Sequence, residues 1–559
     1  MTQSIEGSKA APASPGCCTN LHDHLKLLDE AGLLITVNEP INKDTEMHAL
    51  VRWQFRGGIP EDQRKAFLFT NIVDGKGRHY DIPVVIGALA ANSEIYRIGM
   101  GVERLEDIGP RWMHAVANPI APVVVHEAPC QEIVITGDDL KGTGQGLDAL
   151  SIPISTPGFD VSPYLTSSNV ITKDPESGIQ NMGTYRGCLK APDRLGIMML
   201  YAARAGGHTH WKKYKARGEK MPCAIVLGCP PVIAFCGPQK LGEDVDELSV
   251  AGALLGKPVH VVRAKTVDLL VPADAEIVIE GLIDTDFLEP EGPFGESHGH
   301  IALEDFNMHM QVTAITRKHK PIITSIISQV TPSESSVIKR VAYEPMFLSH
   351  LRDHLSIKGV IKVSLHEPLT NLRRVIIIQV KRNTPTTEVW RALYGAMSLQ
   401  SSCGKYVIAV NDDIDPSNSD SVFWALSYRS NPELDTQIIK HRERGHGPRT
   451  DRRSSSDSSL LVDATMKEDM PPLALPKREY MENAKAIWER LGLPALKPES
   501  PWFGYSLGDW SEEWDEAAQR AASGDYEENG RRSAQRRRTN VEPNTPVRDA
   551  TESEGDRSR

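Results

Sequence analysis

A series of short β-branched segments in the middle of the chain is the feature that most constrains the fold. Gly, Pro or Asp separates these segments, which include QEIVITG, QNMGTYRGCLK, PCAIVLG, PVHVVRA and AEIVIEGLI. Many short strands at this spacing are typical of a barrel or split barrel, whereas a doubly wound sheet alternates strands with helices. Residues 123–330 are therefore predicted to form one domain of the barrel or split-barrel kind.

Helix and strand signals alternate on both sides of this domain. Residues 21–55 predict helix, strand and helix, and residues 65–90 predict two strands around an Asp74-Gly75 turn, a good hairpin signal. Together they indicate an N-terminal α+β unit over residues 20–122. Residues 331–495 predict an α/β unit whose nearly all-apolar strands are buried on both faces. The predicted fold class is thus a multi-domain α+β protein with a C-terminal α/β domain.

Both ends of the chain have compositions that predict disorder. Residues 1–19 are small and polar with Pro, and the extension over residues 496–559 has few apolar side chains after Ser523. Such a segment cannot bury enough apolar surface to offset its conformational entropy, so we expect disorder from about residue 523. The basic run RRSAQRRR (531–538) is either an anion-binding tail or a solvated charge run balanced by nearby acids.

Composition and terminal sequence argue against several classes of protein. The 559 residues include 63 Lys and Arg against 74 Asp and Glu, and this net charge of −11 gives no reason to expect a nucleic-acid partner. No stretch approaches the ~18 uninterrupted apolar residues of a transmembrane segment, and the first residues lack the basic region and apolar core of a secretory signal. Eight cysteines without a CxxC pair predict a reduced, cytoplasmic chain.

The densest chemical signal is a turn that carries two acids, Glu291-Gly-Pro-Phe-Gly-Glu296. A tight turn can bring two like charges together, which raises the pKa of one carboxyl and lets it donate a proton near neutral pH. Arg186 follows NMGTY in a strand context and could hold a carboxylate through its bidentate fork. From the residues alone, a solvated loop and a surface arginine remain the alternatives.

Two further positions suggest ligand binding or a purely structural role. His208, in GGHTH, could bind metal or phosphate or serve as a hydrogen-bonded structural histidine. Glu247 begins the helical ELSVAGALLG, where an acid most often interacts with the helix dipole. The segment Gly295-Glu-Ser-His-Gly299 fits GxSxG, but a Pro/Gly-rich loop stands where a nucleophile elbow needs a strand. Hydrolase, dinucleotide-binding, NTPase and zinc-protease functions therefore lack support.

Taken together, six blocks resemble the UbiD family of prenylated-flavin-dependent decarboxylases. They are NMGTYR (181–186), GCPP (228–231), DLLVPADAEIVIEG (268–281), EGPFGESHG (291–299), KYVIAVNDDID (405–415) and VFWALSYR (422–429). The blocks occur in the family's order, and the resemblance spans roughly residues 20–495. It implies a central split β-barrel of the flavin-reductase type that binds prenylated FMN, and a C-terminal domain that serves oligomerisation and the substrate pocket.

The same resemblance implies roles for individual residues. Arg186 would bind the substrate carboxylate and pair with Glu291, and Glu296 would donate a proton to carbon. Asn181 and Glu247, with His208 as a candidate third ligand, would bind a divalent ion, usually manganese, that holds the cofactor phosphate. The other cofactor contacts would be Thr184, Tyr185, Ala205, Gly206, Gly237, Pro238 and Gln239. In related ferulic acid decarboxylases the last loop also helps to hold K+, but here it lacks their serines, so a K+ site rests on backbone carbonyls or is absent.

These residue types suit the loss of CO2 from an sp2 carbon, because a cofactor must take up an electron pair that side chains cannot stabilise. The resemblance implies a non-oxidative decarboxylase, reversible under high CO2, that acts on an aromatic or α,β-unsaturated carboxylic acid. The tyrosine before Arg186 favours hydroxybenzoate-type substrates. The implied partners are a prenyltransferase that supplies the cofactor and further copies of the chain in a dimer or hexamer. The alternatives are a flavin reductase that uses unmodified FMN and a non-catalytic cofactor-binding subunit.

Overall fold

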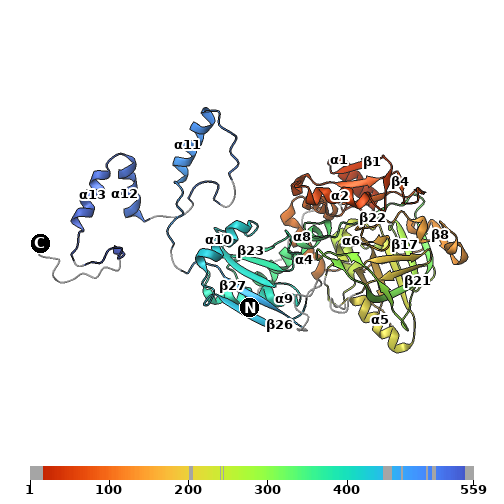
Figure 1. Ribbon diagram of the computed structural model, residues 1–559. Helices are drawn as coiled ribbons and strands as arrows, with labels where there is room; N and C mark the ends of the chain where they lie inside the picture. Colours follow the sequence, from red (N-terminus) through yellow and green to blue (C-terminus); the bar gives the residue numbers. More distant parts are fainter. Residues whose placement is uncertain are drawn as a thin grey trace, which may run out of the picture. The chain divides into compact units, whose positions relative to one another are not determined.

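The computed structural model divides into two compact units, Met1–Thr465 and Met466–Arg559 (Figure 1). It describes residues 17–199, 205–239, 241–242, 245–444, 456–467, 470–498, 502–506, 511–539 and 541–547. Helix α11 (Arg478–Arg490) falls in the second unit, whereas the sequence groups it with the C-terminal α/β domain. No helix in the described parts of the chain is both long enough and apolar enough to cross a membrane.

The N-terminal region of the first unit combines four α-helices with small mixed sheets. The helices are α1 (Leu21–Glu30), α2 (Met47–Arg56), α3 (Ser93–Met100) and α4 (Ile108–Ala117). One sheet has the order β1-β3-β6-β22, formed by Leu34–Val37, Ala66–Phe69, Val84–Ile86 and Ile323–Ser325. A second sheet has the order β2-β4-β5, formed by Ile41–Asn42, Ile72–Val73 and His79–Tyr80. Strands β4 and β5 pair antiparallel across Asp74-Gly75, so the predicted hairpin is confirmed.

The prediction of disorder near the N-terminus is wrong at Cys17 and Cys18, which are both buried. The Cys17 thiol donates to the carbonyl oxygens of Met100, at 3.0 Å, and Leu254, at 3.4 Å. A side chain as small as cysteine can reach these carbonyls because Gly101 presents no Cβ against it. This contact involves distant residues, so local composition does not reveal it. Residues 1–16 lie outside the described residues.

The central region is built on a ten-stranded sheet with the order β11-β10-β14-β17-β21-β13-β12-β9, and β18 and β8 also pair with β21. In chain order, β8 to β13 are Ile133–Thr136, Tyr164–Leu165, Asn169–Lys173, Gln180–Thr184, Gly187–Ala191 and Arg194–Ile197. The later strands, β14, β17, β18 and β21, are Met221–Leu227, Ile277–Ile283, Glu289–Glu291 and Asp305–Arg317. The pairings among these described strands do not close into a ring.

Although β11 and β12 lie near opposite ends of this order, only Tyr185 and Arg186 separate them in the chain. Consecutive Cα atoms are about 3.8 Å apart, so Thr184 and Gly187 lie within about 11 Å of each other. The sheet must therefore curl until its two ends nearly meet, which is the geometry of a split barrel. The predicted multi-domain α+β fold is confirmed, and Arg186 lies at the slit.

Helices and shorter strands surround this sheet. The helices are α5 (Gly206–Arg217), α6 (Pro231–Cys236) and α7 (Glu247–Leu255). Strands β7 (Val123–Val125), β15 (His260–Arg263) and β16 (Leu270–Pro272) form a small separate sheet. Helix α7 begins with the Asp246 side chain accepting from Leu248 N–H, and it ends at Gly256 in the left-handed conformation. These caps fix Glu247 in the first turn of α7, facing the sheet.

The C-terminal region of the first unit has a five-stranded sheet with the order β23-β24-β25-β27-β26. The strands β23 to β27 are Val360–Leu365, Val375–Val380, Tyr406–Asn411, Thr436–Arg442 and Asp457–Asp463, and the helices α8 to α10 are Glu334–Ser349, Thr386–Leu399 and Ser419–Arg429. Strands β24, β25 and β27 are parallel, and most of their apolar residues are buried, as predicted. Helix α8 contacts both α4 and β23, and so joins the N-terminal region to this sheet (Figure 1).

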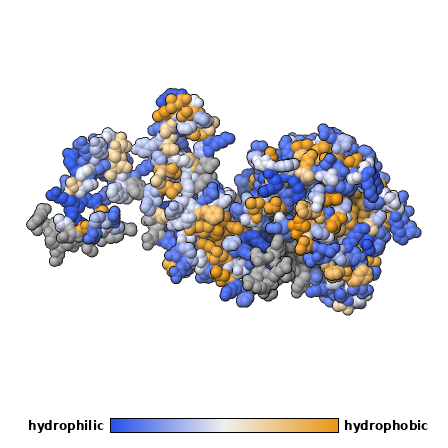
Figure 2. Space-filling model, viewed as in Figure 1, coloured by the Kyte–Doolittle hydropathy of each residue, from blue (hydrophilic) through white to orange (hydrophobic). Residues whose placement is uncertain are grey.

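The second unit contains α11, α12 (Glu512–Ala522) and α13 (Tyr526–Gln535), so the predicted disorder from about residue 523 is wrong for α13. None of these helical residues is buried, and the surface of α12 and α13 is largely hydrophilic (Figure 2). Polar pairs stabilise α13 instead: Asn529 Nδ2 donates to Ala517 O at 2.7 Å, and Arg532 pairs with Glu528 at 3.0 Å. This pairing favours the solvated-charge interpretation of the basic run. Residues 548–559 lie outside the described residues.

Candidate active site

Arg186 meets both acids of the Glu291–Glu296 turn at the slit of the curled sheet. Its Nε donates to Glu291 Oε1 at 3.0 Å and its Nη2 donates to Glu291 Oε2 at 2.6 Å, which makes a bidentate pair. Its Nη1 donates to Oε1 of Glu296. The structure thus brings together the three residues that the sequence predicts as catalytic, although more than 100 positions separate Arg186 from the acids.

This trio is nearly closed to solvent. The side chains of Arg186, Glu291 and Glu296 are 6%, 1% and 11% exposed. Burial by itself lowers the pKa of Arg186, but the charge of Glu296 and the bonds to Glu291 outweigh it, so the pKa of Arg186 is raised. The guanidinium carbon also lies 4.8 Å from the centroid of the Phe294 ring, whose face attracts a cation. The arginine is therefore firmly held as a cation.

A polar frame that the sequence analysis did not identify fixes the turn. Asp160 Oδ1 accepts from Gly295 N–H at 2.9 Å, and its Oδ2 accepts from Thr156 N–H at 2.6 Å. Arg52 Nη2 donates to the Ser155 carbonyl oxygen at 2.8 Å. Burial raises the pKa of Asp160. Asp160 lies in an ordinary Pro/Gly loop without a motif, and only the folded structure shows that it holds the residue next to Glu296.

Asn181 and Glu247 form a second cluster, between β11 and α7. Asn181 Nδ2 donates to Glu247 Oε1, and the Met182 N–H donates to Glu247 Oε2, both at 2.8 Å. Burial raises the pKa of Glu247 to about 7. Asn181 Oδ1 is buried without a hydrogen-bond partner among the described residues. An unpaired amide oxygen beside a carboxylate is a donor set that suits a divalent cation.

His208 lies in the first turn of α5, two residues after Gly206. Its Nδ1 contacts the Met199 carbonyl oxygen at 3.2 Å, and burial lowers its pKa. No set of three His, Cys, Asp or Glu side chains within the described ranges could hold a metal ion. A divalent site at this place would therefore need the Asn181 oxygen, and the role of His208 as third ligand stays a prediction.

Apart from Glu247, the residues predicted to contact the cofactor come from three segments, which the structure brings close together. The Thr184 N–H donates to the Gly237 carbonyl oxygen at 3.2 Å, and the Tyr343 hydroxyl donates to the Pro238 carbonyl oxygen at 3.4 Å. Two glycines keep this region open: a Cβ at Gly206 would lie 2.3 Å from Asn181 Oδ1, and one at Gly237 would lie 2.5 Å from Thr184 Oγ1. Such a small-residue cradle fits a phosphate-bearing cofactor. The remaining predicted contacts, Tyr185, Ala205 and Gln239, lie in the same three segments.

Family models of 3-octaprenyl-4-hydroxybenzoate carboxy-lyase match three successive parts of the chain. The N-terminal domain of this enzyme matches residues 25–112, its Rift-related domain matches 123–330, and its C-terminal domain matches 337–463. An uncharacterized protein of Aquifex aeolicus (strain VF5) is 30% identical over 512 residues, with 85% of this chain and 99% of the relative covered.

Solved structures of two enzymes are similar over most of the chain. HmfF from Pelotomaculum thermopropionicum, a UbiD-class enzyme, in complex with FMN is 28% identical, with a TM-score of 0.72 and coverage of 83% of this chain and 99% of that chain. An evolved dimeric form of HmfF in complex with prFMN is also 28% identical, with a TM-score of 0.69 and coverage of 82% and 97%. The closed form of vanillic acid decarboxylase from Sedimentibacter hydroxybenzoicus is 25% identical, with a TM-score of 0.71 and coverage of 84% and 99%.

The fold and the matches to all three domains define the protein as a carboxy-lyase. The chain belongs to the UbiD family. The resemblance seen in the sequence is confirmed, and this membership argues against an ordinary flavin reductase.

Proposed function

We propose that this carboxy-lyase removes CO2 from an aromatic or α,β-unsaturated carboxylic acid, without net oxidation, and uses prenylated FMN. The observation that carries the proposal is the buried Arg186 held by both acids of one turn. The vanillic acid decarboxylase among the similar structures supports an aromatic acid, and the HmfF complexes support a flavin cofactor. A hydroxybenzoate-type substrate and reversal under high CO2 are part of the same proposal.

The unequal contacts of Arg186 support separate roles for the two glutamates. Glu291 occupies Nε and Nη2, so it fixes the guanidinium plane, while Glu296 contacts only Nη1. A substrate carboxylate that binds Nη1 displaces Glu296 from its cation. A carboxylate that loses its cation in a water-poor site binds a proton more tightly, so Glu296 then holds a proton to donate.

The reaction is balanced by one proton. The bond between the substrate carbon and its carboxylate breaks, CO2 leaves, and a C–H bond forms with the proton of Glu296, which solvent later replaces. Prenylated FMN, when bound, supplies the electron sink that the substrate carbon needs. Arg186 orients the carboxylate, and the rings of Phe294 and Tyr164, both within 6.0 Å of its guanidinium carbon, help to exclude water.

The cluster at Asn181 and Glu247 would hold the cofactor through its phosphate. We assign a divalent ion, Mn²⁺ by family resemblance, to Asn181 Oδ1 and the Glu247 carboxylate, with His208 as third ligand. The unpaired Asn181 oxygen supports this assignment. A K⁺ ion would depend on the backbone of Gly237, Pro238 and Gln239, where the first two carbonyls already accept hydrogen bonds.

The proposal extends to the setting of the enzyme. All eight cysteines are free and buried, which fits a reducing, cytoplasmic compartment. A prenyltransferase would supply the cofactor, and the dimeric HmfF form supports a homo-oligomer.

The test is Glu296→Gln in holoenzyme produced together with a prenyltransferase. We expect CO2 release from a panel of aryl acids to fall at least 100-fold, because proton transfer by a placed acid contributes roughly 10²–10⁴-fold. The matched control is Glu289→Gln, on the same segment, which pairs with Lys190 at 2.7 Å outside the trio. Undiminished CO2 release by Glu296→Gln would refute the role of Glu296, and NAD(P)H oxidation without CO2 release would favour a reductase.

A further inference from the structure

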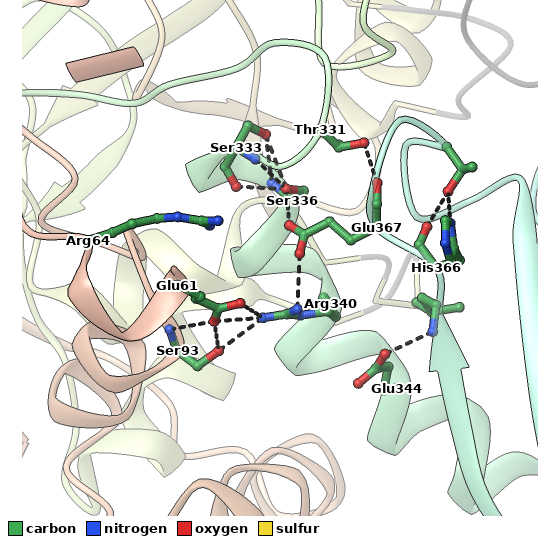
Figure 3. Close-up of polar contacts among 12 residues, drawn as sticks. Glu61, Arg64, Ser93, Thr331, Ser333, Ser336, Arg340, Glu344, His366 and Glu367 are labelled. Carbon is green, nitrogen blue, oxygen red and sulfur yellow. Dashed lines mark hydrogen bonds and ion pairs between the residues drawn. The ribbon is translucent and has the colours of Figure 1, made fainter. Parts of the chain in front are cut away.

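A cavity of about 970 Å³ lies between the N-terminal region and the C-terminal region of the first unit. The segment η1 (Glu61–Gln63) and helices α3 and α4 line one side, and α8 and the end of β23 line the other. Its described lining residues include neither the Arg186 trio nor any residue predicted to contact the cofactor. Figure 3 shows the polar wall of this cavity.

Arg340, on α8, binds two carboxylates at this wall. Its Nη2 donates to both carboxylate oxygens of Glu61 at 2.8 Å, and its Nη1 donates to Glu367 Oε2 at 3.0 Å. Ser93 Oγ accepts from the same Nη2 at 3.1 Å. Glu61 and Glu367 are therefore both bound by one arginine, which links the N-terminal region to the C-terminal region.

Arg64 lines the same cavity and lacks such a partner. The residue is 8% exposed, its Nε donates to the Ile59 carbonyl oxygen at a long 3.4 Å, and its guanidinium carbon lies 5.2 Å from the Phe55 ring centroid. Its Nη1 is buried with no hydrogen-bond partner among the described residues. In Figure 3 the side chain extends towards the space between Glu61 and Ser336. A buried guanidinium donor without an acceptor is costly, so this arginine has unused hydrogen-bonding capacity at the wall of the cavity.

The rest of the cavity limits the ligand. The negative charges of Glu61 and Glu367 act on Arg64, so a ligand that carries more than one negative charge, such as phosphate, is repelled more strongly than a monocarboxylate. Apolar side chains line the adjoining part: Leu105, Ile108, Met113, Val341 and Leu348. A ligand that fits both parts has one carboxylate for the guanidinium fork and an apolar body.

We propose that this cavity binds a small organic monocarboxylate with an apolar body, and that Arg64 receives its carboxylate. The site is separate from the proposed catalytic site, and the proposal does not depend on the reaction carried out there.

The test follows 4-fluorobenzoate by ¹⁹F NMR as it is titrated into the full-length holoenzyme. We expect a bound resonance whose dissociation constant rises at least tenfold in Arg64→Leu and is unchanged in Glu296→Gln, so that binding at the catalytic site is told apart. The matched control is Arg352→Leu, which removes a half-exposed arginine of the same cavity that pairs with Asp353 at 3.3 Å and should bind as the wild type does.

Two further ligands and a second variant make the result of this titration decisive. The neutral 4-fluorobenzamide should bind at least tenfold more weakly than the acid, and inorganic phosphate should not displace the acid. If Arg64→Leu does not fold, Val341→Phe, which narrows the apolar part, should weaken binding at least fivefold. The absence of any bound resonance sensitive to Arg64 or Val341, or displacement by phosphate, would overturn the proposal.

Discussion

Replacement of Arg186 by methionine tests the buried trio through protein stability, without reference to any substrate. The Glu291 side chain is 1% exposed and would lose both of its bonds to the guanidinium, while Glu296 would lose its contact with Nη1. Removing one partner of a buried ion pair costs about 3–5 kcal/mol, because the charge that remains is desolvated and uncompensated. We therefore expect Arg186→Met to lower the free energy of unfolding by about 3–5 kcal/mol at pH 7.

A double-mutant cycle with Glu291→Met separates the pair from general damage. When Arg186 and Glu291 are both replaced by apolar side chains, Glu291 no longer leaves a stranded charge and only Glu296 loses its cation, so the double variant should be less destabilised than the sum of the single variants by about 1–3 kcal/mol. The assay is urea unfolding of the full chain, followed by tryptophan fluorescence and by far-UV circular dichroism. Coincident transitions from the two probes are needed before free energies are compared.

The control is a partly exposed pair on the same segment. Arg194, whose side chain is 43% exposed, pairs with Glu289 at 3.3 Å, and Arg194→Met should cost no more than about 1 kcal/mol. If Arg186→Met costs no more than Arg194→Met, or if the cycle with Glu291 shows no coupling, the buried bidentate pair is not present in solution and the reasoning fails.

Three further predictions concern residues around the site and the core. Asp160→Asn keeps only one of the two acceptors for Gly295 and Thr156 N–H, so CO2 release should fall at least tenfold while the visible spectrum of bound flavin is unchanged; an unchanged rate would contradict a positioning role. Gly206→Ala places a Cβ 2.3 Å from Asn181 Oδ1 and should at least halve the manganese content of the purified protein, whereas Gly530→Ala, with open space around it, should not. His24 is buried with a pKa lowered to about 4, so as the pH falls the unfolded state is protonated at a higher pH than the folded state. The stability that neutral His24 contributes above pH 6.5 is therefore lost as the pH falls towards 4. That shift is worth about 3 kcal/mol, and His24→Gln should flatten this part of the urea-midpoint profile; an unaltered slope would show that His24 is not buried and neutral.

Local patterns predict the elements of this fold well, because most of them are set by short-range rules. The hairpin at Asp74-Gly75 follows from turn chemistry: the Asp74 carboxylate accepts from the N–H groups of Lys76, at 2.8 Å, and Arg78, at 2.9 Å. The apolar strands β24 and β25 were predictable for the same reason, since a strand buried on both faces has no polar alternation. By contrast, the order of Cys17 and of α13 depends on contacts with distant or neighbouring elements.

The residues of the candidate site are likewise of two kinds: those that a sequence motif predicts and those that only the tertiary structure reveals. The sequence identifies Arg186, Glu291 and Glu296 because the blocks that carry them are specific. It does not identify Asp160 or Arg52, because these residues contact backbone groups that only the tertiary structure places near the turn. A residue that positions a loop needs no particular neighbours in sequence, so no motif records it.

The register of the central sheet explains why one arginine can meet two acids so far away in the chain. Gly187, next to Arg186, pairs with Ile197 on β13, and Ile197 pairs with Met308 on β21. Three residues along β21, Asp305 pairs with Glu291 on β18. Strands β13 and β21 therefore lie between Glu291 and the start of β12 in the pairing order. The Glu291 side chain can reach Arg186 over β13 because Gly196 has no side chain there; a Cβ at Gly196 would lie 3.2 Å from Glu291 Cγ. The short link between β11 and β12 brings the two ends of the curled sheet together and places Arg186, which lies in this link, beside the acids.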